Sequence, residues 1–112
     1  MEGKERQRYI LFEVLAEGEV GEKSLIRAVW RTLTHLYGDV GASKTGLWLV
    51  EYEKSQYGII RTNIQSLPMI RATLAVIRTI EGKDCILAIQ GVSGTIKALK
   101  KKHLYKITSD SQ

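Results

Sequence analysis

The order in which two hydrophobic periods alternate along the chain constrains the fold more than any other feature. Four short segments share an enrichment in β-branched and aromatic residues that is typical of strands: 8–16, 45–53, 57–64 and 83–92. Two longer segments, 22–37 and 66–80, repeat their apolar residues with the period of a helix, and a weaker helical pattern runs from 94 to about 106. The sequence therefore predicts strand, helix, strand, strand, helix, strand, helix.

Glycine and proline place the predicted helix ends. Gly38 follows the last apolar residues of the first helix, which is a common helix stop. Pro68 falls in the first turn of the second helix, where proline is tolerated, and Gly82 follows that helix. Only three residues, 54–56, separate the second and third strands, so we expect a hairpin there.

Two strand-helix-strand halves of this kind predict an α+β fold, a ferredoxin-like or RNA-recognition-like βαββαβ sandwich in which both helices cover one face of a four-stranded antiparallel sheet. The additional C-terminal helix is expected on the other face or at an edge. A length of 112 residues suits one domain. We expect that domain to span 1–112, with a short charged N-terminal tail at 1–7 and a flexible C-terminal tail at 107–112.

Positive charge gathers in two stretches of the sequence. Seventeen Lys and Arg against twelve Asp and Glu give a net charge of +5, and neither 54–78 nor 96–106 contains an acidic residue. A solvated helix face explains such clusters about as often, but the lack of interspersed acids favours an RNA-binding surface. The candidate RNA-binding residues are Arg8, Arg61, Arg71, Arg78, Lys97, Lys100, Lys101 and Lys102.

The predicted sheet lacks the aromatic pairs on which RNA-recognition modules stack bases. If Ile10 and its alternate neighbours face the helices, the first strand presents Tyr9, Leu11 and Glu13 on its open side. The third strand has no aromatic side chain beyond Tyr57 at its start. We therefore expect no base stacking on the sheet and an RNA contact led by charge and shape.

No catalytic or metal-binding constellation is evident in the sequence. His35 lies on the polar side of its helix, His103 among apolar positions, and Cys85 in an apolar strand, where it is expected to be a core residue. Glu51 and Glu53 alternate onto one face of a strand, which an exposed hairpin explains better than a cation site. We predict no catalytic residue, no metal ligand and no cofactor bound by the chain.

Two further features concern location and phosphate binding. No apolar run is long enough to cross a bilayer and the N-terminus is charged, so a cytoplasmic protein is expected. The turn 91–95 precedes the last predicted helix, and it suits either a phosphate oxygen at the helix N-terminus or a simple N-cap.

Three stretches together resemble the Pop-type small protein subunit of ribonuclease P, which occurs in archaea and eukaryotes. They are Arg8-Tyr9-Ile10-Leu11 with Glu13; the central block with Gly38, Gly41, Gly46-Leu47-Trp48, Glu51-Tyr52 and Gly58-Ile59-Ile60-Arg61; and Gly91-Val92-Ser93-Gly94-Thr95-Ile96-Lys97. The resemblance extends from about Arg8 to Leu104. Eukaryotic members usually carry a longer acidic C-terminal extension, so the archaeal form is implied.

The resemblance implies a noncatalytic subunit of the enzyme that removes the 5′ leader from precursor transfer RNA. In that enzyme the RNA and its bound Mg²⁺ carry the chemistry, and the small subunit pairs with ribonuclease P protein component 3, in assemblies of two copies of each. The Gly-rich segment with Gly38, Gly41 and Gly46 is a candidate partner or self-association contact, or a flexible loop that contacts RNA. The alternative is a ferredoxin-like regulatory domain that binds a small ligand and self-associates.

Overall fold

The strands form one antiparallel sheet in the computed structural model, which describes residues 6–105 and 107. The strands are β1 (Gln7–Ala16), β2 (Trp48–Glu53), β3 (Tyr57–Asn63), β4 (Thr79–Ile80) and β5 (Lys83–Ser93). Their order in the sheet is β2-β3-β1-β5-β4. The strand pairings place β1 between β3 and β5, so the first and third strands of the predicted four are central, as the βαββαβ plan requires.

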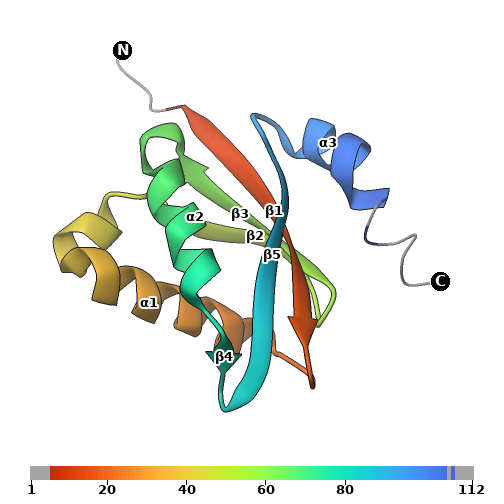
Figure 1. Ribbon diagram of the computed structural model, residues 1–112. Coiled ribbons are helices and arrows are strands. Elements are labelled where there is room, and N and C mark those ends of the chain that lie inside the picture. The colour runs from red at the N-terminus through yellow and green to blue at the C-terminus, as the bar shows by residue number, and fades with distance from the viewer. Residues whose placement is uncertain (1–5, 106, 108–112) are drawn as a thin grey trace.

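The helices lie on both faces of this sheet (Figure 1). One face carries α1 (Glu22–Ser43) and α2 (Leu67–Val76), the latter preceded by a single 3₁₀ turn, η1 (Ile64–Ser66). The opposite face carries α3 (Ile96–Leu99) and the π-helical turn that continues it, η2 (Lys100–Leu104). The predicted α+β fold is therefore confirmed, and the additional helix takes the other face. No helix within residues 6–105 is long and apolar enough to cross a membrane.

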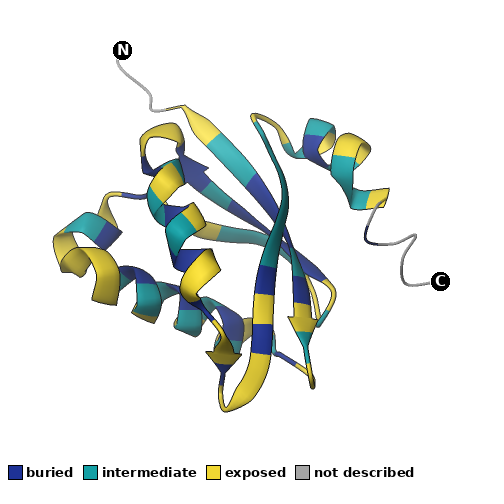
Figure 2. Ribbon diagram, in the orientation of Figure 1, coloured by how far each residue is buried: buried dark blue, intermediate teal, exposed yellow. Residues whose placement is uncertain are grey.

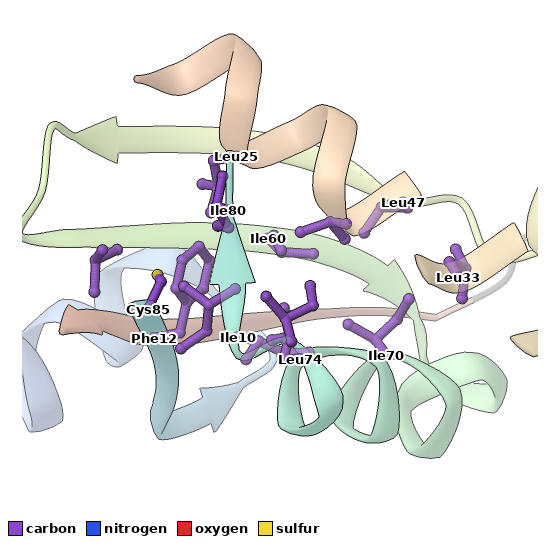
Figure 3. Close-up of a cluster of buried hydrophobic side chains, with 14 of the residues drawn as sticks. Ile10, Phe12, Leu25, Leu33, Leu47, Ile60, Ile70, Leu74, Ile80 and Cys85 are labelled. Carbon is purple, nitrogen blue, oxygen red and sulfur yellow. The ribbon is translucent and has the colours of Figure 1, made fainter. Parts of the chain in front are cut away.

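The larger core lies between the sheet and the pair α1 and α2 (Figure 3). Ile10 and Phe12 of β1 and Ile60 of β3 point to this side, and all three side chains are fully buried. Cys85 is buried in the same cluster, which confirms its prediction as a core residue. The alternation of β1 predicted from Ile10 is therefore correct.

A second, smaller core lies under α3. Leu11 of β1 and Ile59 of β3 are fully buried there by Leu99, and Tyr57 completes the group. Ile107, which the sequence assigns to the C-terminal tail, is 5% exposed and packs in the same group. The other residues predicted for that tail, 108–112, lie outside the described residues. Figure 2 shows that the helical segment after β5 mixes exposed and intermediate residues around the buried position of Leu99.

Two predicted helix ends differ from the structure. Gly38 adopts φ +77° and bends α1 without ending it, because the chain resumes helical geometry and continues to Ser43. The segment from Gly38 is thus mostly helix, and the open loop expected there is wrong. The second helix ends at Val76, and Ile80 then pairs with Lys83 as β4, across a tight turn of two residues with positive φ. Burial of Ile80 in the main core favours this hairpin over further helix.

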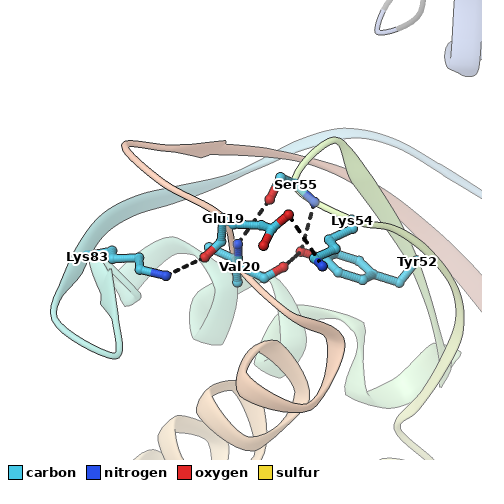
Figure 4. Close-up of polar contacts among 6 residues, drawn as sticks. All are labelled: Glu19, Val20, Tyr52, Lys54, Ser55 and Lys83. Atoms are coloured by element: carbon cyan, nitrogen blue, oxygen red, sulfur yellow. Dashed lines mark hydrogen bonds and ion pairs between the residues drawn. The ribbon is translucent and has the colours of Figure 1, made fainter.

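A set of polar contacts fixes the loop between β1 and α1 to two other turns (Figure 4). The hydroxyl of Tyr52 donates to the carbonyl oxygen of Val20 at 2.6 Å, and the backbone N–H of Val20 donates to Ser55 Oγ at 3.0 Å. Lys83 Nζ donates to the carbonyl oxygen of Glu19 at 2.6 Å, while Lys54 forms an ion pair with the Glu19 carboxylate at 3.3 Å. These contacts hold this end of the sheet together.

Candidate nucleic-acid interface

Basic residues gather where β1 begins and β3 and β5 end. Arg8 of β1 pairs with Thr62 of β3. The backbone of Arg6 accepts a hydrogen bond from Ile64 at 2.9 Å, and the backbone of Lys44 accepts one from the Asn63 side chain at 2.7 Å. Lys97 lies in α3, just after the end of β5. We call the following group the basic end of the sheet: Arg6, Arg8, Lys44, Arg61 and Lys97.

Acidic residues gather at the opposite end, around the turns that Figure 4 shows. Glu13 of β1 and Glu53 of β2 both lie across from Tyr57 at the start of β3. The backbones of Glu17 and Asp84 are joined by a hydrogen bond of 3.1 Å. The acidic residues of this end are Glu13, Glu17, Glu19, Glu22, Glu53, Glu81 and Asp84. Among the described residues, the acids elsewhere are Asp39 and Glu51. Few described carboxylates are therefore near the basic end to repel an approaching anion.

Arg61 occupies the centre of the basic end. It lies directly across from Tyr9 on one side and from Trp48 on the other, so the three residues form a row across β1, β3 and β2. The side chain of Arg61 makes no hydrogen bond or ion pair with any described residue, and its buried Nε–H has no acceptor. No described carboxylate forms an ion pair with Arg61, so its positive charge is available to attract an incoming anion.

The other predicted RNA-binding residues do not all join this group. Arg71 is exposed on α2, on the opposite face of the sheet. Arg78 borders a hollow with Glu17 and Asp84, close to acids. Lys101 and Lys102 are exposed on η2. The fold therefore places Arg8, Arg61 and Lys97 at the same end of the sheet and Arg71 and Arg78 away from it.

Lys100 forms an ion pair with the carboxylate of Glu51. Its Nζ lies 2.8 Å from Glu51 Oε1, and the hydroxyl of Tyr57 donates to Glu51 Oε2 at 2.7 Å. The hydrogen bond from Lys100 lowers the pKa of Glu51 below its ordinary value, and burial raises the pKa of Tyr57 above its own. Glu51 thus ties the C-terminal helix to β2. The described residues contain no group of three or more His, Cys, Asp or Glu side chains positioned to hold a metal ion.

Acidification is expected to weaken this tie. A carboxyl whose pKa is lower in the folded protein stabilises it above the unfolded pKa, and the contribution is lost as pH falls through the folded value. We expect Glu51→Gln to lower the free energy of unfolding at pH 7 by at most about 1 kcal/mol, since both side chains are partly exposed, and to have less effect near pH 3. Urea unfolding at the two pH values measures this difference. Glu53→Gln, on the same strand, is the control, and equal acid dependence in both variants would contradict the assignment.

The turn 91–95 is an N-cap. Thr95 Oγ1 accepts a hydrogen bond from the N–H of Ala98 at 3.1 Å, and the N–H of Thr95 lies 3.4 Å from Ser93 Oγ. Gly91 in this turn lies against the ring of His103, because a Cβ built there would come within 2.2 Å of that ring. Of the two interpretations of this turn, the capping one accounts for its contacts, and His103 is a packed residue.

Sequence reasoning missed Arg6 and Lys44 at the basic end. Arg6 and Lys44 lie outside the acid-free stretches, and hydrogen bonds hold their backbones beside Ile64 and Asn63 at the end of β3. Trp48 joins the row because β2 has an irregularity between Leu49 and Glu51. With strict alternation Trp48 would face away from Glu51, whereas the register sets both on the face of α3. No local sequence signal specifies this shift.

Comparison with known proteins places these features in a family. The model of the Rpp14/Pop5 family matches residues 8–104. Ribonuclease P protein component 2 of Pyrococcus furiosus is 33% identical over 102 residues, which cover 90% of this chain and 85% of that protein. The protein of the same name from Methanocaldococcus jannaschii is 35% identical over 101 residues, covering 90% of this chain and 75% of that protein.

A solved structure supports the fold independently of sequence. A chain in the cryo-EM structure of yeast ribonuclease MRP superposes with a TM-score of 0.69 at 10% identity, and the match covers 99% of this chain and 98% of that one. The family model and the relatives also span the region in which the resemblance was found. The chain belongs to the Rpp14/Pop5 family.

Proposed function

We propose that the chain is a noncatalytic protein subunit of ribonuclease P, which binds and stabilises the catalytic RNA for removal of the 5′ leader from precursor transfer RNA. The observation that carries the proposal is the basic end of the sheet, in a member of a family whose curated relatives are named ribonuclease P protein component 2. A cluster of Arg and Lys whose neighbouring acids lie at the other end of the sheet favours the binding of RNA phosphates. The reaction and its Mg²⁺ belong to the RNA in this proposal, and the complex is cytoplasmic.

The proposal includes ribonuclease P protein component 3 as a partner, in an assembly of two copies of each chain. The bend of α1 supports a protein contact, because Leu36, Tyr37 and Val40 are exposed around Gly38. Val40 is 67% exposed, and such an apolar patch on a helix is typical of an interface. Gly41 lies in the same short helical segment and Gly46 follows it, so this contact includes the glycines singled out in the sequence.

The salt dependence of RNA binding tests the function. Each phosphate contact contributes about 0.7 to 0.9 to the slope of log affinity against log salt concentration. We expect the combined variant Arg8→Gln, Arg61→Gln and Lys97→Gln to reduce that slope by about 2 for ribonuclease P RNA. Filter binding at several KCl concentrations measures it, and cleavage of the transfer RNA leader by the reconstituted holoenzyme at limiting Mg²⁺ is the second readout.

A matched variant separates the position of the charge from its amount. Lys23→Gln, Lys54→Gln and Lys83→Gln remove the same charge near the acidic end, where Lys54 and Lys83 contact Glu19. We expect this variant to keep most of the parent slope. Equal slopes for both variants would contradict the basic end as the binding surface, and leader cleavage that does not depend on the subunit would contradict the function.

A further inference from the structure

The row formed by Trp48, Arg61 and Tyr9 offers one open aromatic face at the basic end. Trp48 is 62% exposed on the edge strand β2, an unusual position for so large an apolar ring. Tyr9 is partly buried against the second core, so its ring is not free on both faces. The helical segment after β5 covers Leu11 and Ile59 in the next row of the sheet and leaves Trp48 open.

Charge at this row is positive and unpaired within the described residues. Arg61 lies directly across from Trp48 and has no acceptor for its buried Nε–H. Glu51, the nearest acid along β2, is held by Lys100 and Tyr57. Arg8 lies near the start of β1, and its guanidinium is 3.7 Å from the position that a Cβ on Gly94 would take. A ring and a guanidinium side by side are the elements that bind one unpaired nucleotide, by stacking of its base and neutralisation of its phosphate.

We propose that an unpaired nucleotide of single-stranded RNA binds here, with its base stacked on Trp48 and its phosphate on Arg61. This inference rests on the proposed function, which it deepens by naming a contact for a base in addition to the phosphate surface. The site departs from the expectation of no base stacking on the sheet, which was drawn from the two central strands, because its ring comes from the edge strand. It takes one base.

An apolar protein segment is the competing occupant. Trp48 itself lines a groove of about 250 Å³ between α1 and β2, together with Ile26, Trp30 and Leu49 among others. Such a segment would leave the positive charge of Arg61 without a counter-charge, whereas a nucleotide offers a base to the Trp48 ring and a phosphate to the neighbouring cation. The observations therefore favour RNA.

Fluorescence of Trp48 tests the site directly. Trp30→Phe leaves Trp48 as the sole tryptophan of the full chain, because the sequence contains only two. We expect a single-stranded oligoadenylate of five nucleotides to quench Trp48 emission and a blunt RNA duplex of matched charge to leave it unchanged. Quenching by ribonuclease P protein component 3 alone, with none by the oligonucleotide, would overturn the proposal in favour of a protein contact.

Substitution of Trp48 separates stacking from electrostatics. Stacking on an aromatic side chain is worth about 1 to 3 kcal/mol per base, so we expect Trp48→Leu to weaken binding of labelled oligoadenylate by about 5- to 150-fold, measured by anisotropy. Because no charge is removed, the salt slope should stay that of the parent. Trp48→Phe should restore most of the affinity.

The possible failures are distinguishable. If Trp48→Leu binds oligoadenylate as tightly as the parent while the basic-end variant still loses its salt slope on ribonuclease P RNA, the stacking site is wrong and the proposed function stands. If the parent chain binds neither RNA, both are wrong. A parallel fall in the salt slope of Trp48→Leu would also overturn the stacking role, because it would indicate a displaced basic surface.

Discussion

Replacing Gly58 by alanine is expected to lower the free energy of unfolding by about 3 kcal/mol, at the upper end of the cost of overpacking a core. A Cβ at Gly58 would lie 2.5 Å from Cζ of Phe12, closer than real side chains approach. The two residues face each other directly across β1 and β3, and Phe12 is fully buried in the main core. The ring is enclosed by the main core, so any shift of it disturbs the side chains packed around it. Urea or guanidinium unfolding measures the loss.

A double-mutant cycle identifies the clash as the cause. Phe12→Leu alone leaves a cavity and is itself destabilising, but Gly58→Ala added to it should cost much less than in the parent. Gly94→Ala is the matched control, because the nearest atoms to its Cβ are at 3.7 and 4.0 Å, which is ordinary contact. An equal cost of Gly58→Ala with phenylalanine or leucine at position 12 would show that strand propensity, and not the ring, sets the effect.

The fold was predictable where side-chain periodicity is strong. Ile10, Phe12 and Val14 alternate in a long central strand. Because these three side chains are buried on one face, the residues between them must lie on the other face. The second helix was harder, because the residues from Ile77 to Ile80 suit a helix and a strand about equally. The backbone pairing with β5 across the turn at Glu81 and Gly82 selects the strand. The apolar pattern of the segment itself does not indicate that pairing.

The candidate interface depends on features that single-sequence reasoning does not contain. Acid-free stretches of sequence grouped Arg61 with Arg71 and Arg78, but a strand and a helix that follow each other lie on different layers of the sandwich. Charge separation along the sheet instead arises from antiparallel pairing, which brings the start of β1 to the end of β3. The irregularity in β2 that turns Trp48 onto this face is a property of the pairing, and only the structure specifies it.

Replacing Leu99 by alanine is expected to be comparably destabilising, and its effect should reach RNA binding. Leu99 is fully buried between α3 and the sheet, in one cluster with Leu11 and Ile59. Removing such a leucine side chain costs about 2 to 5 kcal/mol in well-packed cores. A helical segment this short does not hold its shape alone, so it depends on this docking. We therefore expect amide protection in 96–104 to fall first, as measured by hydrogen exchange.

Leu99→Ala is expected to affect RNA binding through the position of the lysine side chains, because it removes no charge. Leu99→Ala retains Lys97, Lys101 and Lys102, yet it should weaken binding of ribonuclease P RNA because these side chains are no longer held beside the sheet. Leu36→Ala is the matched control, since the same atoms are removed from a side chain that is 42% exposed, and its stability should change by less than about 0.5 kcal/mol. If Leu99→Ala lost stability but bound the RNA with the affinity and salt slope of the parent, the lysines after β5 would have no part in the interface. The RNA contacts would then belong to the residues of the sheet alone, with Arg61 at their centre.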